Sequence, residues 1–212
     1  MSEHCHTLHQ LAAHLTLHSF PFVEHTIPED GIYLLFEEGE KAHGQQRIVR
    51  VGTHTGDRQL RPRLRQHFVQ EKKDRSIFRK NIGRALLHRD HDPFLADWNL
   101  DLTTTAARRL HATRIDSAKQ RAVEAQVSAH LQSHCRFVAF PVAERTKRLL
   151  WESRIVSTIV ACSDCNSSST WLGRESPIAK IRNNGLWQVN ELFRELFSRE
   201  EFAEFERAIT QR

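Results

Sequence analysis

The sequence predicts a small α/β (α+β) protein, in which helices pack against a three-stranded, mostly antiparallel sheet. Two observations support this class. Short runs rich in β-branched and aromatic residues, typical of strands, occur at Ile32–Glu37, Arg47–Gly52 and Arg136–Val142. Elsewhere apolar residues recur every three or four positions, which is the period of a helix. At 212 residues the chain has room for one domain or for a small core with insertions.

The first two predicted strands are joined by a polar loop rich in Glu, Gly and Lys, which predicts a β-hairpin with a longer connection. After the hairpin, Leu60, Leu64 and Phe68 recur every four residues and form the expected buried face of a short helix. On that helix Arg63 and His67 are four residues apart, so their side chains share one face.

The remaining helices follow from the same periodicity. We expect them within residues 1–20 and over residues 76–87, 114–134, 144–160 and 191–209, whereas residues 88–112 are expected to form an irregular insertion. The predicted organisation is an N-terminal helical extension (1–28), a core domain (29–170) with an inserted basic helix at about 75–113, and a C-terminal helical segment packed on the core (171–212).

The segment from Arg58 to Arg89 is strongly basic. It contains eleven Arg and Lys residues and two acidic ones, a formal charge of +9, so that the rest of the chain sums to −4 within a net charge of +5. Such a segment is expected to bind a polyanion, most simply a nucleic-acid backbone, and the alternative is a solvated helical face. The residues expected to contact nucleic acid are Arg58, Arg61, Arg65, Lys72, Lys73, Arg75, Arg79, Lys80 and Arg84.

The four cysteines do not make a disulfide framework in a chain of this length. A single C-x-x-C runs from Cys162 to Cys165, and a structural zinc ion needs a second pair of ligands. No signal peptide and no apolar run of roughly 18 residues is visible, which predicts a soluble, cytoplasmic protein with no membrane partner. The residues that offer a second zinc-binding pair are Cys135 with His134 and Cys5 with His6.

The predicted helix over residues 144–160 carries a carboxylate on its apolar face. Leu149, Val156 and Ile159 form an apolar stripe, and Glu152 falls between the first two of them. A carboxylate in such a position is costly unless it is paired with a cation. Two alternatives follow: Glu152 forms an ion pair with an arginine, or it lines a cleft and holds a metal ion.

An ordered set of residues resembles the GIY-YIG nuclease family. The set comprises Gly-Ile-Tyr at 31–33, Arg-Val-Gly at 50–52, and the pair Arg63 and His67 on the next helix. The first tripeptide matches the family pattern letter for letter. In the second, Arg50 stands where the family usually has a tyrosine. The resemblance extends to about residue 166 and is interrupted between about 75 and 112.

The resemblance implies a metal-dependent endonuclease, a phosphodiester hydrolase that acts on duplex or branched DNA and leaves a 5′-phosphate. Tyr33 would orient or deprotonate the attacking water, and His67 would take the proton onward or bind a phosphate oxygen. Arg63 suits the charge on the phosphate. Glu152 would hold one hard divalent cation, Mg²⁺ with Mn²⁺ as the alternative. Asn166 would steady the site.

The arginine at position 50 has two interpretations. It favours the deprotonated form of Tyr33 through its positive charge, or it marks a domain that has lost catalysis and kept binding. The alternative to an endonuclease is therefore a non-catalytic nucleic-acid-binding module with a degenerate nuclease core. A zinc-stabilised interaction protein is a third hypothesis. No feature of the sequence indicates an oligomeric state.

Overall fold

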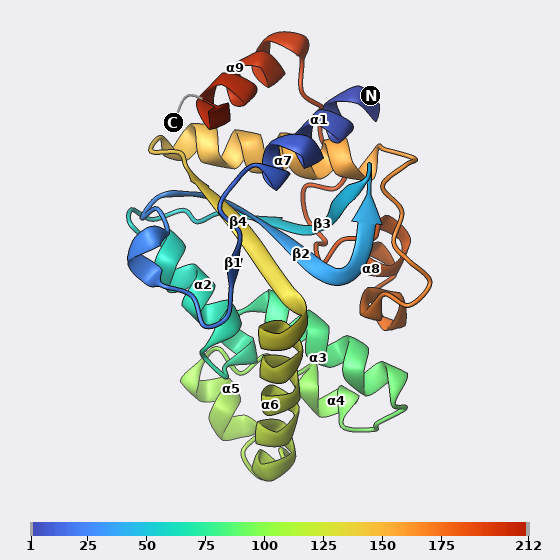
Figure 1. The fold of residues 1–212 in the computed structure, drawn as a ribbon. Helices are drawn as coiled ribbons and strands as arrows, with labels where there is room; N and C mark the ends of the chain where they lie inside the picture. Colours follow the sequence, from blue (N-terminus) through green and yellow to red (C-terminus); the bar gives the residue numbers. More distant parts are fainter. Residues whose placement is uncertain (1, 211–212) are drawn as a thin grey trace.

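The computed structural model describes residues 2–210 and contains one antiparallel sheet flanked by helices (Figure 1). The predicted α/β class is confirmed, and so are the three expected strands. A fourth strand, of two residues, pairs with the outer edge of the strand expected at 136–142. A segment this short has no recognisable pattern in the sequence. In sheet order the strands are β1 (His18–Ser19), β4 (Cys135–Pro141), β2 (Gly31–Ala42) and β3 (Gln45–Gly52).

Helices cover both faces of the sheet. Figure 1 shows α1 (Ser2–Ala13), α7 (Arg145–Val160) and α9 (Arg199–Thr210) on one side. The other side is covered by α2 (Leu60–Phe68), α3 (Ile77–Arg89) and α6 (Ser117–His134). The shorter elements are η1 (Glu24–Thr26), η2 (Lys73–Arg75), α4 (Leu95–Trp98), α5 (Thr105–Leu110), η3 (Leu172–Glu175) and α8 (Ala179–Asn184).

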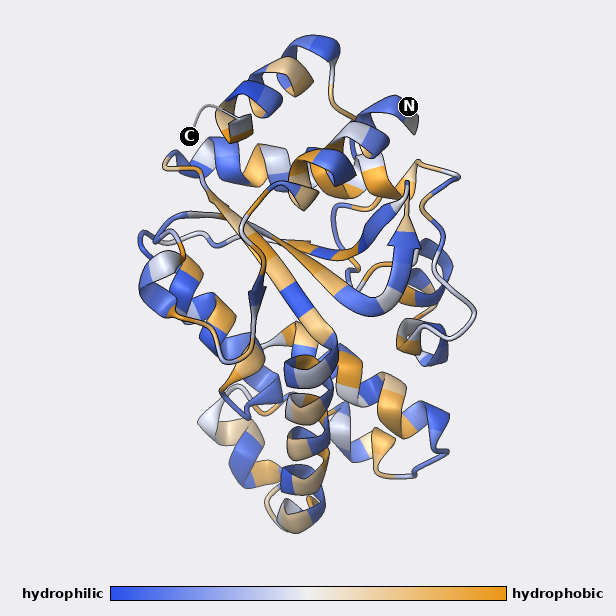
Figure 2. Ribbon diagram, in the orientation of Figure 1, coloured by the Kyte–Doolittle hydropathy of each residue, from blue (hydrophilic) through white to orange (hydrophobic). Residues whose placement is uncertain are grey.

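Alternation along the central strand β2 divides the apolar core into two clusters, because successive side chains of a strand point to opposite faces. Ile32 and Leu34 belong to the cluster under α1, α7 and α9. Tyr33 and Leu35 belong to the cluster under α2, α3 and α6. In Figure 2 the apolar residues accordingly gather along the strands, between the two helical layers. Tyr33 therefore points toward the layer that contains the Arg63–His67 helix.

The strand register places Arg50 beside Tyr33. Tyr33 pairs with Gly52 across β2 and β3, so Arg50, two residues from Gly52, is its diagonal neighbour on the same face. The tyrosine ring lies over the backbone of Gly52, where an added Cβ would be 2.4 Å from the hydroxyl oxygen. Only glycine fits at that position. The register thus explains why the second tripeptide ends in glycine.

The insertion and the last helix differ from their predictions. Residues 88–112 contain two short helices, α4 and α5, rather than irregular chain. The last helix was expected from residue 191 but begins at Arg199. Ser198 and Glu201 form a reciprocal cap there: Ser198 N–H donates to Glu201 Oε2 (2.9 Å), and Glu201 N–H donates to Ser198 Oγ (3.1 Å). This capping box fixes the start of the helix.

The segments on either side of the expected core domain pack into the same two clusters. Leu8 of α1 and Phe205 of α9 belong to the first cluster, and Trp171 and Trp187 belong to the second. Residues 1–28 and 171–212 are therefore continuous with the sheet through a shared core, as far as the structure describes them. Between residues 2 and 210, no helix is both long and apolar enough to cross a membrane.

Candidate active site

Three buried polar side chains meet at the sheet face covered by α2 and α3. The hydroxyl oxygen of Tyr33 lies 2.8 Å from Nε2 of His67 and accepts a hydrogen bond from Nε of Arg50 at 3.0 Å. Tyr33 and His67 have no exposed surface. Arg50 is held by a second hydrogen bond to the carbonyl of Trp187 (2.6 Å), and its guanidinium lies 4.8 Å from the ring centre of Phe78. The cluster therefore has a fixed geometry.

His67 is neutral in this environment. Burial lowers its pKa well below the ordinary value, and the positive charges of nearby arginines, led by Arg63, lower it further. Its other ring nitrogen, Nδ1, lies 2.8 Å from Oγ of Ser76, the residue that caps the N-terminus of α3. A neutral imidazole has one donor and one acceptor nitrogen. When Nδ1 carries the proton, Nε2 is free to accept the proton of the Tyr33 hydroxyl.

Arg63 joins the buried cluster to the surface. It is half-buried on α2, and its Nη1 donates to the side chain of Gln66 (3.1 Å) and to the carbonyl of Arg75 (3.3 Å). Burial lowers the pKa of the guanidinium, whereas Tyr33 and Glu152 raise it. Arg63 also lines a cavity of about 300 Å³, whose other walls are Thr53, His54, Thr55, Gly56, Gln59 and Gln66.

Glu152 lies near the same end of the sheet, on α7. Burial raises its pKa to about 7; Arg50 and Arg63 lower it, and Glu191 raises it. Within residues 2–210, neither arginine forms an ion pair with the Glu152 carboxylate at contact distance. Of the two alternatives from the sequence, an arginine salt bridge is therefore not what the structure shows, and the carboxylate is left without a direct cationic partner.

The expected apolar stripe around Glu152 needs one correction. Val156 and Ile159 are buried as expected, but Leu149 is 37% exposed, and Trp151 and Ile155 complete the buried face of α7. The ring of Trp151 packs edge-on against Phe205 of α9. Glu152 consequently lies at the border of this face rather than in its centre, half-buried and able to reach the end of β3.

Asn166 does not join the other predicted site residues. It is exposed, and its side-chain amide donates to the carbonyl of Ser163 (2.5 Å) within a local turn. Its loop is attached to the turn end of the β2–β3 hairpin, where Ser168 N–H donates to Glu40 of β2 (3.2 Å). Tyr33 lies at the opposite end of β2. The structure therefore does not bring Asn166 together with the residues that it was expected to support.

Three of the cations expected to contact nucleic acid are buried, which corrects the prediction for Lys73, Arg79 and Lys80. Arg79 has no exposed surface and forms a two-point pair with Glu124 of α6, from Nε at 3.0 Å and from Nη2 at 2.8 Å. Lys73 and Lys80 both donate to the carbonyl of Leu100 at 2.9 Å. Buried and committed in this way, these side chains tie the insertion to the core rather than presenting free charges at the surface.

The other predicted cations divide into paired and free groups. Lys72 and Arg75 are exposed, and no ion pair occupies either side chain among the residues described. The paired group consists of Arg58 and Arg61, which bind Glu29, of Arg65, which binds Glu24, and of half-buried Arg84, which binds Asn81 and Asn99.

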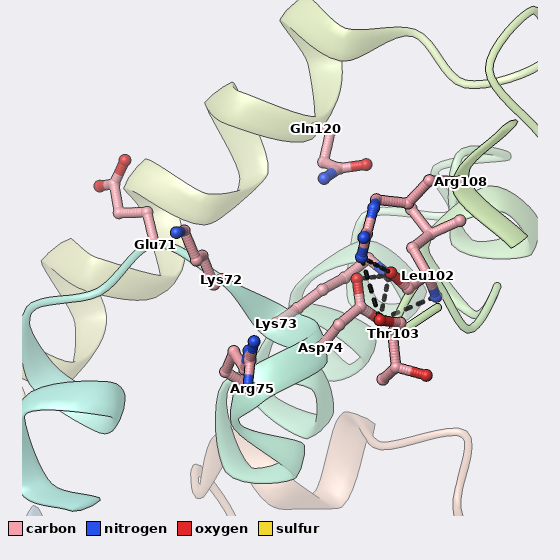
Figure 3. A pocket seen from close by; sticks show the side chains of 9 residues that line it. All are labelled: Glu71, Lys72, Lys73, Asp74, Arg75, Leu102, Thr103, Arg108 and Gln120. Carbon is pink, nitrogen blue, oxygen red and sulfur yellow. Dashed lines mark hydrogen bonds and ion pairs between the residues drawn. The ribbon is translucent and has the colours of Figure 1, made fainter. Parts of the chain in front are cut away.

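A second cavity has a volume of about 460 Å³ and includes Arg75 in its lining (Figure 3). Arg75 connects the two, because its carbonyl binds Arg63 and its side chain lines the second cavity. Arg108 of α5 lines the opposite wall, where its Nη1 donates to the carbonyls of Leu102 (2.9 Å) and Thr103 (3.0 Å). Sequence reasoning missed Arg108 because it assigned no structure to this part of the insertion. The remaining lining residues are Glu71, Lys72, Lys73, Asp74 and Gln120.

These side chains form a candidate centre at one end of the antiparallel sheet of an α/β domain. Residues 5–212 match the family model described as the GIY-YIG domain, and the chain belongs to that family. The family generally comprises endonucleases, which generally use divalent metal ions. No curated protein and no solved structure matches the chain.

Proposed function

We propose that this protein is a metal-dependent endonuclease that hydrolyses DNA phosphodiester bonds at a centre formed by Tyr33, Arg63 and Glu152. The observation that carries the proposal is the double contact of the Tyr33 hydroxyl, with neutral His67 on one side and with Arg50 on the other. A phenol between a proton acceptor and a positive charge is equipped to release and recover a proton.

The arginine at position 50 serves this proton transfer directly. When His67 Nε2 takes the proton, the charge that remains on the Tyr33 oxygen faces the Arg50 guanidinium at 3.0 Å. Tyr33 has no exposed surface in the structure. An attacking water therefore meets its hydroxyl only after substrate binding displaces the side chains that cover it.

Arg63 is the phosphate-binding group of the proposal. Its guanidinium is planar, always charged and held in one orientation by Gln66 and the Arg75 carbonyl, and it lies at a cavity wall. Such a donor binds a non-bridging phosphate oxygen and stabilises the negative charge that builds on it during displacement.

The residues around Glu152 fit a divalent cation. A half-buried carboxylate with its pKa raised to about 7, and with no arginine in direct contact, is stabilised by an added positive charge. Mg²⁺ needs few protein ligands because it keeps several of its waters, and Mn²⁺ is the alternative. Such an ion supplies polarisation of a phosphate oxygen and of a bound water. Glu152 would hold it.

The DNA backbone is proposed to run from the Arg63 cavity along the second cavity. Lys72, Arg75 and Arg108 all line the second cavity (Figure 3). Each phosphate contact steepens the loss of affinity with salt, by roughly 0.9 in the logarithmic slope for duplex DNA. The acidic residues Glu71 and Asp74 line the same cavity and limit how closely the backbone approaches it.

Complete burial of Tyr33 favours a second candidate, a DNA-binding module without catalysis. Parallel assays of binding and of supercoiled-plasmid cleavage in Mg²⁺ separate the two. Under the endonuclease proposal, Glu152→Gln abolishes cleavage and keeps binding. Glu144→Gln, which changes an exposed carboxylate just before α7, cleaves like the wild type. Salt-sensitive binding with no cleavage in any of several divalent ions would support the binding module instead.

A further inference from the structure

Five thiol and imidazole side chains from three distant parts of the chain meet on the sheet face opposite Tyr33. Cys5 and His9 come from α1, His43 from the turn between β2 and β3, and Cys162 and Cys165 from the loop after α7. One ligand atom from each of Cys5, His9, His43 and Cys165 lies within 4.8 Å of the others. Three of the chain's four cysteines are thus gathered at one point, apart from the candidate active site.

One separation within the cluster has the length that a tetrahedral zinc site requires. With Zn–S bonds of about 2.3 Å and Zn–N bonds of about 2.0 Å, neighbouring ligand atoms lie roughly 3.3–3.8 Å apart. Sγ of Cys162 lies 3.4 Å from Nε2 of His43. The thiol of Cys5 lies within hydrogen-bonding reach of both Cys162 and Cys165. Cys162 therefore lies beside both His43 and Cys5, at the edge of the group formed by Cys5, His43 and Cys165.

His9 supports the cluster from outside this group of four. Its Nδ1 lies 2.8 Å from the carbonyl of Cys5 and must therefore carry the proton. Its Nε2 accepts from the backbone N–H of Ile48 at 3.3 Å and lies 3.7 Å from Sγ of Cys165. Both ring nitrogens are engaged in this way, so His9 orients the site, and Cys162 is the fourth ligand.

The chemistry of the donors also suits zinc. Cys5, Cys162 and Cys165 are buried, and sulfur ligands combined with an imidazole are the donor set that zinc prefers. The nearby guanidinium of Arg47 is already committed to Glu40 and to the carbonyl of Gly185.

The backbone at His43 is consistent with a ligand role. His43 has φ of +52°, in the left-handed region that most residues avoid. This conformation at the tight turn directs its ring toward the cysteines. The two-residue turn of His43 and Gly44 requires positive φ at both positions, so the hairpin itself fixes this backbone and holds the His43 ring beside Cys162.

We propose that Cys5, His43, Cys162 and Cys165 bind one structural zinc ion that joins α1, the β2–β3 turn and the loop after α7. The C-x-x-C motif noted in the sequence supplies two of the four ligands. Its second pair of ligands is Cys5 with His43, and neither His6 nor Cys135 takes part. The ion contributes to folding rather than to the proposed cleavage, because it lies on the other face of the sheet.

The test is metal analysis of the full-length protein, purified without added metal and without a polyhistidine tag. We expect about one zinc per chain in the wild type, and almost none in Cys162→Ser and Cys165→Ser. Cys135→Ser removes the fourth, distant cysteine and is expected to keep its zinc, as is His9→Gln. Retention of zinc in Cys162→Ser together with its loss from His9→Gln would overturn this ligand set.

Two wild-type measurements keep the proposal testable if the cysteine variants do not fold. Co²⁺ exchanged into the protein should show the intense visible bands of tetrahedral coordination and a thiolate charge-transfer band. Removal of the metal with a chelator should lower the thermal midpoint, and Zn²⁺, but not Mg²⁺, should restore it. Absence of bound zinc and of these cobalt bands, or a disulfide between any two of Cys5, Cys162 and Cys165, would overturn it.

Discussion

Arg50, which stands where the resemblance to the GIY-YIG family leads one to expect a second tyrosine, donates a hydrogen bond from Nε to the Tyr33 hydroxyl across 3.0 Å. The same guanidinium binds the carbonyl of Trp187 at 2.6 Å. An arginine that serves both acceptors is part of the buried cluster rather than a surface charge. The departure from the family pattern therefore adds a cation to the site.

Loss of this cation should reduce cleavage more than binding. For Arg50→Met we expect a fall in cleavage rate of about 10²–10³-fold, the usual cost of removing one positioned charge-stabilising donor. Arg50→Lys keeps the charge but cannot bind both acceptors with one planar group, so we expect a smaller loss. Single-turnover cleavage of a labelled duplex gives the rates. Arg121→Met, an exposed arginine on α6, is the control and should match the wild type.

Glu152→Gln should stabilise the protein above neutral pH when no Mg²⁺ is added. The pKa of Glu152 is raised from 4.5 in the unfolded chain to about 7 in the fold, so folding favours its protonated form. Wild-type stability therefore falls as pH rises from 4.5 to 7, by on the order of 3 kcal/mol. The glutamine variant has no ionisable group at this position, so its stability does not fall in this way. Urea unfolding at pH 4.5 and pH 8 measures the difference.

The control for this effect is Glu144→Gln, whose carboxylate is exposed and should give the same small change at both pH values. A Glu152→Gln variant that is more stable by an equal amount at pH 4.5 and pH 8 would show that packing, and not the buried charge, is responsible. Saturating Mg²⁺ should reverse the sign, because the wild type then gains ligand binding that the variant lacks.

Substitution of Arg79 should lower protein stability, whereas substitution of Arg75 should weaken DNA binding, although the two residues lie only four positions apart. Arg79→Met leaves the buried Glu124 carboxylate unpaired, so we expect about 3–5 kcal/mol of destabilisation. Arg75→Ala removes an exposed cation, so stability should hold while DNA affinity falls and the salt slope drops by about 0.9. Chemical unfolding and binding titrations at several salt concentrations measure both. Weaker DNA binding by folded Arg79→Met, with Arg75→Ala unaffected, would contradict the assignment.

Much of the sheet could be predicted because its strands are long and rich in β-branched and aromatic residues. The hairpin, the Arg63–His67 helix and the position of Tyr33 depend on local pattern and on an ordered motif, and both can be read along the chain. Strand β1 could not be predicted, because its two residues form a strand only through their pairing with β4.

The sequence-based expectations failed where the environment of a residue depends on a partner far away in the sequence. Nothing near Arg79 in sequence indicates that Glu124, forty-five residues later, will bury it. The spacing of fourteen residues from Glu152 to Asn166 does not show that the loop turns toward the far end of the hairpin. The gathering of His43 with Cys5 and Cys165 could not be predicted for the same reason, because His43 comes from a turn with no metal-binding pattern of its own.

Cleavage of supercoiled plasmid by the wild type and by Tyr33→Phe, in Mg²⁺ and in its absence, tests the central claim most directly. The substitution removes one buried oxygen, and circular dichroism and DNA binding would confirm that the fold and the affinity persist. We predict Mg²⁺-dependent nicking by the wild type and a loss of at least about 100-fold in Tyr33→Phe. Equal cleavage by both proteins, or none by the wild type with any divalent ion tested, would contradict a catalytic role for the cluster.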